Sequence, residues 1–237
     1  MSRPFHFKEF SIIQDHAAMK VGTDSVLLGA WASHPKPLRI LDIGCGTGLL
    51  SLMLAQRYSE ANILGVDIEA GAIQDAQLNV MQSKWTDRIR LVHENFFDLK
   101  NEVAFDLIIS NPPFFPTDTP SPKESRALAR SGKNFNLMEW MAEAKKRLAP
   151  DGRIALILPI DQRTNLEQSM KECTLFLRRI CFVRPTLTKS IHRILVELGN
   201  EKSDHCKDEE LFIETEKRHH YSDEYIRLTR PFYLKMD

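Results

Sequence analysis

Residues 38–48 read Leu-Arg-Ile-Leu-Asp-Ile-Gly-Cys-Gly-Thr-Gly, and this stretch decides the fold. The apolar residues of 38–43 are typical of a buried parallel strand. Glycines then stand at alternate positions, Gly44, Gly46 and Gly48, where side chains would keep a ligand away from the backbone. A helical pattern follows over 49–57. A strand, a glycine turn and a helix N-terminus predict a nucleotide-type site, with free backbone N–H groups facing the ligand.

The spacing of the glycines distinguishes this turn from a dinucleotide-binding turn. A dinucleotide fingerprint is G-x-G-x-x-G, whereas this chain has G-x-G-x-G with Asp42 two residues ahead of the first glycine. A carboxylate there repels a pyrophosphate and attracts a cation. The pattern resembles motif I of the class I S-adenosylmethionine (SAM) methyltransferases, whose cofactor carries a sulfonium and an amino group. The alternative is a plain glycine-rich turn, which a second motif downstream disfavours.

Strands and helices alternate along the rest of the chain, which predicts a mostly parallel sheet with helices on both faces. The strands predicted after the glycine turn are 63–67, 89–92, 105–110 and 154–158. The helices predicted between and after them are 70–82, 137–148 and 163–173. Strands 176–183 and 192–198 are predicted to form an antiparallel hairpin at the sheet edge. The fold class is α/β, a Rossmann-like doubly wound sheet of the class I SAM-methyltransferase type.

Polar residues stand at the predicted ends of four strands: Asp42, Asp67, Asn95 and Asn111. Ligands of doubly wound sheets bind at the carboxyl ends of the strands, so these side chains are expected to share one crevice. Asp67 is placed to accept both ribose hydroxyls of an adenosine. Segment 94–98, the exit of the strand 89–92, is where methyltransferases usually hold the adenine of the cofactor.

The fourth strand runs into the second motif, Asn111-Pro112-Pro113-Phe114, which we take as the catalytic loop. The amino group of adenine is a poor nucleophile because its lone pair is delocalised into the ring. The Asn111 oxygen and the Pro112 carbonyl offer acceptors for its two N–H bonds, which aims the lone pair at the methyl. The prolines add a stiff backbone without donors. Phe114 offers a stacking face worth about 1–3 kcal/mol per base. An ordinary Asn-Pro loop is the alternative.

The motifs together resemble the amino-group methyltransferases with [Asn/Asp/Ser]-Pro-Pro-[Phe/Tyr/Trp]. The whole chain is similar to the bacterial tRNA1(Val) (adenine(37)-N6)-methyltransferase family. The segments that carry this resemblance are 5–10, 18–24, 28–31, 42–48, 111–114, 221–229 and 232–235. The resemblance implies methyl transfer from SAM to N6 of adenosine 37, beside the anticodon of a valine tRNA. Many members carry Tyr at the position of Phe114, a difference that removes a hydroxyl and keeps the stacking face.

The resemblance also implies a set of residues that hold the cofactor. They are Lys20, Thr23, Asp24, Asp42, Gly44, Gly46, Gly48, Asp67, Ile68, Asn95, Phe96 and Asn111. At 237 residues the chain is expected to form a single methyltransferase domain, 1–237. Residues 1–34 are expected to be an N-terminal extension that contributes to the active site.

The charges are balanced, with 32 Lys+Arg and 32 Asp+Glu, so net charge gives no preference for nucleic acid. The expected partner is the anticodon stem-loop of tRNA. The residues expected to contact it are Arg3, Lys8, Arg126, Arg130 and Lys133. The last three belong to a long segment, 115–136, that we interpret as a substrate loop over the active site, with a disordered surface loop as the alternative. The charged run 202–210 is expected to face solvent.

Four cysteines without a C-x-x-C pair predict free thiols in a reducing compartment. They are Cys45, Cys173, Cys181 and Cys206. Neither these nor the scattered histidines have the paired spacing of a metal site, so no metal is expected. No apolar run reaches the length of a membrane span, and the start of the chain lacks a signal sequence. A cytoplasmic monomer is expected.

Three other functions compete with the leading one. Glutamine N5-methyltransferases of release factors carry Asn-Pro-Pro-Tyr, because an amide nitrogen needs the same two acceptors. They usually have a helical N-terminal domain, for which the residues before 38 leave no room. Guanine-N2 methyltransferases of ribosomal RNA use the same tetrapeptide, but often have a duplicated domain that this length excludes. A SAM-fold binding protein without turnover is disfavoured by the presence of Asp42, Asp67 and Asn111.

Overall fold

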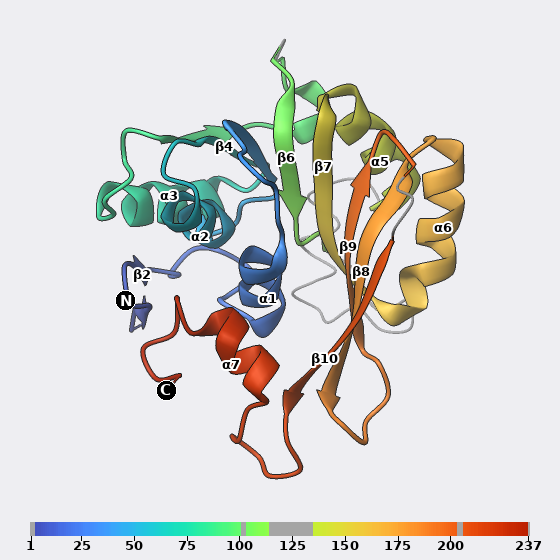
Figure 1. Ribbon diagram of the computed structural model, residues 1–237. Helices are drawn as coiled ribbons and strands as arrows, with labels where there is room; N and C mark the ends of the chain where they lie inside the picture. The colour runs from blue at the N-terminus through green and yellow to red at the C-terminus, as the bar shows by residue number, and fades with distance from the viewer. Residues whose placement is uncertain (1–2, 101–102, 114–134, 203–205, 237) are drawn as a thin grey trace.

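The computed structural model describes residues 3–100, 103–113, 135–202 and 206–236. An eight-stranded sheet with helices on both faces dominates this part of the chain (Figure 1). Its strands are β3 (Arg39–Ile43), β4 (Asn62–Asp67), β5 (Ile89–His93), β6 (Phe105–Ser110), β7 (Leu148–Pro159), β8 (Phe176–Thr186), β9 (Arg193–Gly199) and β10 (Lys207–Glu214). Two short strands, β1 (Phe5–His6) and β2 (Ser11–Ile12), form a separate antiparallel pair.

The helices follow the predicted alternation with the strands. They are α1 (Thr23–Trp31), α2 (Leu49–Arg57), α3 (Ala70–Met81), α5 (Leu137–Lys146), α6 (Arg163–Glu172) and α7 (Asp223–Thr229), with the 3₁₀ turns η1 (Phe96–Asp98) and η2 (Ile160–Gln162). Each helix predicted above is present: α2 has the predicted ends, and the C-terminal ends of α3, α5 and α6 differ by one or two residues.

The strand order is β10-β8-β9-β7-β6-β3-β4-β5. From β3 the chain winds outward through β4 to β5 and then returns to β6 on the other side of β3, with all these strands parallel. The order therefore reverses between β3 and β6, the point at which such sheets bind ligands. The predicted antiparallel hairpin is confirmed as β8 and β9. Strand β10 lies outside that hairpin, parallel to β8, and forms the edge.

Alternating side chains place a separate hydrophobic core on each face of the sheet. In β7, Ala155 and Ile157 face the core beneath α1, α2 and α3, whereas Leu156 and Leu158 face the core beneath α5 and α6. This period of two is the pattern of a strand buried on both faces. The three helices that precede β5 thus lie on one side of the sheet, and α5 and α6 on the other (Figure 1).

The charged run 202–210 was expected to face solvent, and this expectation is wrong for part of it. Glu209 of β10 accepts hydrogen bonds from the Arg179 guanidinium, at 2.9 Å, and from the Trp31 indole, at 2.9 Å. The Arg179 guanidinium lies over the Trp31 ring, 4.0 Å from its centre. The run is part of an edge strand, and period-two alternation turns Glu209 inward while Asp208 and Glu210 stay exposed.

The two ends of the chain pack against each other. Phe7 and Tyr233 form a β-bridge and stack with ring centres 5.7 Å apart. The backbone N–H of Lys8 donates to the Phe232 carbonyl at 2.8 Å. Phe232 is fully buried. The N-terminal hairpin is therefore held by the C-terminal tail as well as by the segment that follows it.

Two buried polar side chains of α3 hold the segment before α1 against that helix. The Asp75 carboxylate accepts from the backbone N–H groups of His16 and Ala17, each at 2.8 Å, and lies 2.8 Å from His16 Nδ1. One turn later, the Asn79 amide bonds both backbone groups of Ile13, at 2.7 and 2.9 Å. These bonds fix the path of the chain into α1.

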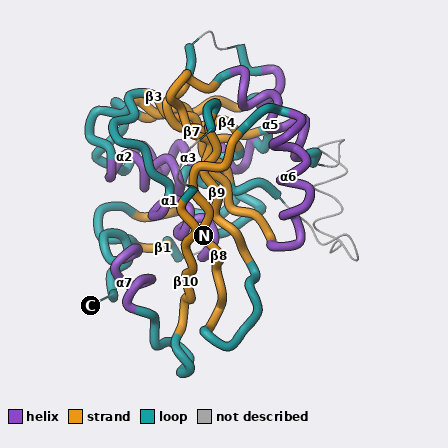
Figure 2. The backbone as a smooth tube through the Cα atoms, turned by 45° about the vertical axis from the view of Figure 1, so that its right-hand side comes forward, coloured by secondary structure: helices purple, strands orange, loops and turns teal. Residues whose placement is uncertain are grey.

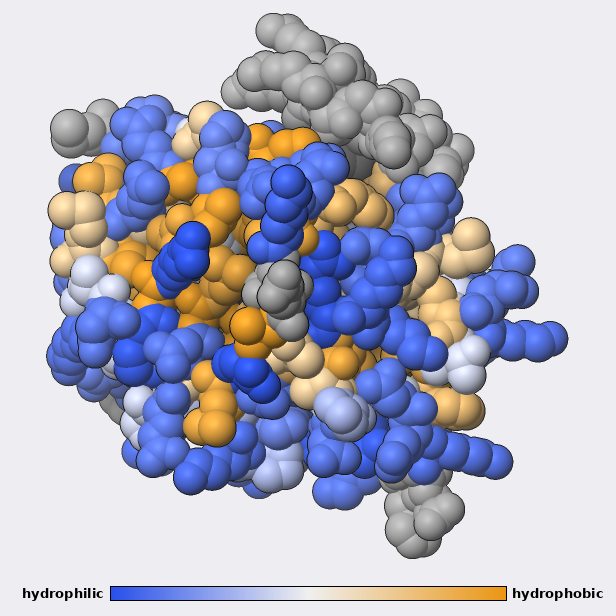
Figure 3. All heavy atoms as spheres, turned by 90° about the horizontal axis from the view of Figure 1, so that it is seen from above, coloured by the Kyte–Doolittle hydropathy of each residue, from blue (hydrophilic) through white to orange (hydrophobic). Residues whose placement is uncertain are grey.

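The face at the amino ends of the parallel strands is opposite the ligand crevice. Its surface mixes hydrophilic and hydrophobic residues (Figure 3). Here the Asp106 carboxylate accepts the backbone N–H groups of Leu38 and Arg39, at 2.8 and 2.9 Å, and so fixes the start of β3. The predicted site residues Asp42, Asp67 and Asn111 lie at the other end of these strands.

We predict that Asp75→Ala destabilises the protein by on the order of 3 kcal/mol, because it leaves buried N–H groups of 16–17 without acceptors. Urea unfolding measures the loss. Asp87→Ala is the matched control, since Asp87 is exposed and surface changes cost within about 0.5 kcal/mol. Equal stability of the two variants would contradict the anchoring role of Asp75.

Candidate active site

The glycine turn between β3 and α2 requires a backbone that other residues rarely adopt. Gly44, Gly46 and Gly48 all have positive φ, at 70°, 56° and 79°. A Cβ at Gly44 or Gly46 would meet nothing within 4 Å, whereas one at Gly48 would lie 3.4 Å from the Ala76 Cβ. The first two glycines therefore leave open space beside the backbone, and the third lets α3 pack closely. This confirms the predicted turn and leaves room for a ligand.

Asp42, at the end of β3, is a fully buried carboxylate. Its Oδ2 accepts from the Ser51 hydroxyl at 2.7 Å, while its Oδ1 has no partner among the described residues. Burial raises the pKa of Asp42 to about 7, and the nearby Asp67 charge adds to the rise, although the Ser51 hydrogen bonds oppose it. A carboxylate in this state is stabilised by any cation that approaches it.

Asp67 ends β4 and ties that strand to the glycine turn. Its Oδ2 accepts from the Gly46 N–H at 2.8 Å and its Oδ1 from the Glu69 N–H at 2.9 Å. Burial raises the pKa of Asp67, and the backbone donors of Glu69, Gly46 and Ile68 oppose this. Because a carboxylate has about four lone-pair positions, each oxygen keeps capacity for a further donor.

The predicted adenine region lies after β4 and β5. Ile68 is 49% exposed, and its carbonyl lies 3.0 Å from His93 Nε2. The Asn95 side chain accepts the Phe97 N–H at 3.1 Å and so caps η1. The Phe96 ring is buried against Trp140, with ring centres 6.0 Å apart. Of the two adjacent rings, Phe97 is the exposed one, a difference that the sequence alone did not reveal.

Residues 20–25 approach the same end of the sheet through α1. Lys20 and Thr23 are exposed. The Asp24 carboxylate accepts from the Arg193 guanidinium at 2.8 Å, which joins the start of α1 to the start of β9. Ser25, one residue later, contacts the catalytic loop. The structure thus brings part of 1–34 to the strand ends that carry the candidate site.

Asn111 follows β6 directly and is half-buried. Its Nδ2 donates to the Ser25 hydroxyl oxygen at 2.9 Å. The preceding Ser110 is buried and donates to the Ile43 carbonyl at 2.7 Å, which locks β6 to the end of β3. Pro112 is buried and Pro113 exposed. Phe114 lies outside the described residues.

Of the residues predicted to contact RNA, Arg3 and Lys8 are described and exposed. The Lys8 ammonium donates to the Arg230 carbonyl at 2.8 Å. Arg126, Arg130 and Lys133 lie outside the described residues. Within the part of the chain that the structure describes, no contact brings Arg3 or Lys8 to Asn111.

Four residues of the site region were missed by sequence reasoning: Ser25, Asp75, Asn79 and Arg193. Asn79 is central, because its Nδ2 donates to the carbonyls of Thr47, in the glycine turn, and Ile13, both at 2.9 Å. The available signal was the four-residue spacing of Asp75 and Asn79, which places both on the apolar face of their helix.

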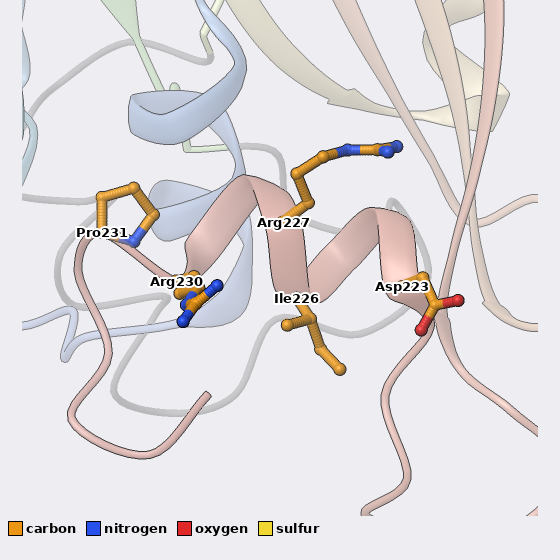
Figure 4. Close-up of a pocket in the computed structure, with 5 residues that line it drawn as sticks. All are labelled: Asp223, Ile226, Arg227, Arg230 and Pro231. Carbon is orange, nitrogen blue, oxygen red and sulfur yellow. The ribbon is translucent and has the colours of Figure 1, made fainter. Parts of the chain in front are cut away.

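A pocket on α7 is separate from these residues. Asp223, Ile226, Arg227, Arg230 and Pro231 line it, and Ile226 and Arg227 extend to opposite sides of the helix (Figure 4). None of the five was predicted to bind cofactor or substrate. Among the described residues, no group of His, Cys, Asp and Glu is arranged to hold a metal ion. No described helix is long and apolar enough to cross a membrane.

The residues at the switch point fit SAM. The buried Oδ1 of Asp42 lacks a partner, the carboxylate of Asp67 has capacity for hydroxyls, and open space adjoins Gly44 and Gly46. A ligand with both a positive charge and a ribose satisfies these groups, whereas a pyrophosphate would meet two carboxylates. A doubly wound sheet of this order, with a switch point that attracts a cation and a ribose, defines a class I SAM-dependent methyltransferase.

Comparison with known proteins narrows this class. The methyltransferase small domain family model matches residues 16–182. The tRNA1(Val) (adenine(37)-N6)-methyltransferase of Parabacteroides distasonis is 41% identical over 100% of both chains. That of Vibrio campbellii is 37% identical over 99% of this chain and 97% of its own. The chain therefore belongs to the methyltransferase small domain family, and to the tRNA1(Val) (adenine(37)-N6)-methyltransferase family that it matches over its full length.

Solved structures agree with the fold. A predicted O-methyltransferase of Agrobacterium tumefaciens covers 88% of this chain and 96% of its own, with a TM-score of 0.68 and 16% identity. Pyrococcus horikoshii TYW2 in complex with MeSAdo covers 81% of this chain and 69% of its own, with a TM-score of 0.57 and 13% identity. The protein is a methyltransferase, and its cofactor is SAM.

We predict that Asp42→Asn stabilises the cofactor-free protein at pH 8. Folding raises the pKa of Asp42 from 3.8 to about 7, so its contribution to stability is complete below about pH 4 and lost as pH rises through 7. Asn keeps an acceptor for Ser51 and does not ionise. Thermal unfolding at pH 8 should show a higher Tm for the variant, equivalent to a gain of at least about 1 kcal/mol in the free energy of unfolding. The Tm values of the variant and the natural protein should converge as the pH is lowered toward 4.

The same variant should bind SAM about tenfold more weakly in calorimetry at pH 8, because a negative charge facing the cation is lost. A Tm below that of the natural protein at pH 8, without SAM, would contradict the burial penalty assigned to Asp42. Unchanged SAM affinity would remove Asp42 from the cofactor site.

Proposed function

We propose that this protein transfers a methyl group from SAM to N6 of an adenosine in tRNA, namely adenosine 37 of tRNA1(Val). The names of its full-length relatives support this substrate, and they do not favour a glutamine or guanine methyltransferase. The observation in the structure that supports it best is the orientation of Asn111 at the switch point.

Ser25 determines which atom Asn111 presents. The Asn111 Nδ2 is engaged by the Ser25 hydroxyl oxygen at 2.9 Å. The amide oxygen lies on the other branch of the same planar group, and it remains available as an acceptor. An acceptor is what an exocyclic amine requires. The Asn111 amide oxygen and the Pro112 carbonyl together accept the two N–H bonds of the amine. This favours a pyramidal nitrogen whose lone pair is free to attack.

The residues around this loop supply position rather than acid–base chemistry. SAM brings a methyl group already activated by its sulfonium. Asp42 and Asp67 hold the cofactor by charge and hydroxyl contacts, and the glycine turn lets it approach the backbone. Asn111 and Pro112 hold the amine in line, which is the main contribution of the protein to the rate. The nitrogen becomes acidic once it is alkylated, so its surplus proton passes to water. Phe114, outside the described residues, is assigned the stacking role.

The remaining cofactor contacts are part of the same proposal. We assign them to the backbone of Gly44, Gly46 and Gly48, to Ile68, Asn95 and Phe96 on the adenine side, and to Lys20, Thr23 and Asp24. Phe96 contributes its backbone, because its ring is buried. Residues 1–34 thereby complete the site of a single domain, 1–237. The bond from Asn111 to Ser25 supports this role for the N-terminal segment.

The target is proposed to be an unpaired nucleotide of the anticodon stem-loop. A base must leave its stack to reach Asn111, which costs a few kcal/mol and least in a single-stranded loop. We place the reaction in the cytoplasm and assign it to a monomer. The four cysteines are free, as thiols of a reducing compartment are.

We assign the Asn111 side chain to the target amine and not to the cofactor, and we predict that Asn111→Ala lowers kcat roughly 10²-fold, as loss of one preorganised hydrogen-bonding group does, and leaves the Kd for SAM within about twofold. Ser25→Ala should lower kcat about tenfold, because the amide loses its orientation while keeping its oxygen. Single-turnover kinetics and calorimetry measure the two quantities. Ser25→Thr should restore much of the rate, and the exposed Ser59 provides the control Ser59→Ala. Normal kcat in Asn111→Ala would refute the catalytic assignment.

We predict one N6-methyladenosine per tRNA1(Val) transcript, at position 37. The purified protein and SAM are incubated with the transcript, and nucleosides are quantified by mass spectrometry. Replacing adenosine 37 by guanosine should abolish incorporation. Equal labelling of the guanosine transcript would replace adenine by guanine as the target. Labelling of a release factor in place of both transcripts would transfer the activity to protein.

A further inference from the structure

Two hairpin tips project beyond the carboxyl end of the sheet. The first, 187–192, connects β8 to β9, and the second, 215–220, connects β10 to the segment before α7. They lie at the same end of the molecule in both backbone views (Figures 1 and 2). The register explains this, because Thr186 pairs with Glu214 at the last rung between β8 and β10. Both tips therefore begin at the same level and side by side.

Hydrogen bonds to backbone groups order both tips. In the first, the Lys189 N–H donates to the Thr186 carbonyl at 3.2 Å, and the Arg184 guanidinium donates to the Lys189 carbonyl at 3.0 Å. In the second, the Thr215 N–H donates to the His220 carbonyl at 2.7 Å, and Glu214 forms a β-bridge with Tyr221. The side chains of the tips are thus presented on ordered turns.

The tips carry cations that are not neutralised by the described residues. Lys189 in the first tip, and Lys217 and Arg218 in the second, are exposed, and no described residue forms a hydrogen bond or ion pair with their charged groups. Against these three cations the two tips contain one carboxylate, Glu216. The arginines nearer the sheet are different, because Arg184 pairs with Glu210 and is already compensated.

The first tip is continuous with the candidate active site. Its last residue, His192, accepts from the Ile160 N–H at 3.1 Å. The next residue, Arg193, pairs with Pro159 of β7 and bonds Asp24, the neighbour of Ser25. Lys189 is four residues before Arg193, within about 13 Å at 3.3 Å per extended residue. That reach spans a few nucleotide steps along one strand of a nucleic-acid helix.

We propose that the two tips, 187–192 and 215–220, form a binding surface for the phosphate backbone of the tRNA stem that adjoins the target loop. This proposal rests on the proposed function. The cations of the tips would contact phosphates of the RNA and so contribute to the affinity for tRNA, while Asn111 selects the amine of the target base. A chain with no net charge can bind RNA when its cations are grouped beside the site.

The test replaces the three cations together: Lys189→Gln, Lys217→Gln and Arg218→Gln. None of them belongs to the cofactor site or the catalytic loop. The matched control makes the same loss of charge at the opposite end of the sheet, with Lys100→Gln, Lys171→Gln and Lys202→Gln. Binding of tRNA1(Val) transcript is measured by fluorescence anisotropy from 50 to 300 mM salt, a range chosen to expose counterion release. SAM affinity is measured in parallel.

The tip variant should bind tRNA about tenfold more weakly at 0.15 M salt. Its slope of log K against log salt should be less steep by about 2–3, one contact for each lost cation. The control and the natural protein should agree, and SAM affinity should be unchanged in all three. Equal affinity and slope in the tip variant and the control would overturn the proposal. Methyl transfer by the natural protein distinguishes this failure from failure of the proposed function, which would abolish transfer to tRNA altogether.

Discussion

The hydrogen bond from the Gly46 N–H to the Asp67 carboxylate is the contact on which the rest of the site depends. It joins the end of β4 to the turn after β3, across a backbone that only glycine adopts easily. The glycine turn fixes where α2 begins and leaves space beside Gly44 and Gly46. The buried carboxylate of Asp42 and the half-buried carboxylate of Asp67 are thereby held at one site, at a cost in solvation that a positively charged ligand offsets.

A second constraint acts through the N-terminal segment. The Asn79 amide bonds Thr47 in the glycine turn and Ile13 in the segment that leads to α1. Helix α1 then carries Ser25 to Asn111 at the end of β6. The position of the catalytic loop relative to the glycine turn is therefore fixed through α3, the segment before α1 and α1 itself, which are distant from the loop in sequence. A displacement of α1 would therefore move Ser25 relative to Asn111 and change the acceptor that the amine meets.

The sequence sufficed for features whose cause is local. The glycine pattern predicts the turn between strand and helix, the alternation of strands and helices predicts a mostly parallel sheet, and polar residues at strand ends predict the crevice. It did not reveal Ser25 or Glu209, because their partners lie 86 and 178 residues away and no local pattern encodes a pairing. Phe96 and Phe97 are adjacent and chemically identical, so only the packing of η1 decides which ring is buried. Phe114 and the basic residues of 115–136 stay predictions.

The first half of strand β10 forms an edge of the sheet, whereas residues 212–214 at its end already bond to Tyr221 and Ser222. An edge strand offers unpaired N–H and C=O groups to which strands of other molecules can add, and many proteins protect such edges with charge. Here Lys207, Asp208 and Glu210 are exposed along the first half of the strand, whereas Leu211 is buried. An incoming strand would have to strip water from these charges before it could pair. The charged start of β10 therefore guards the sheet against self-templated aggregation, a form of protection that is independent of its role in packing Trp31.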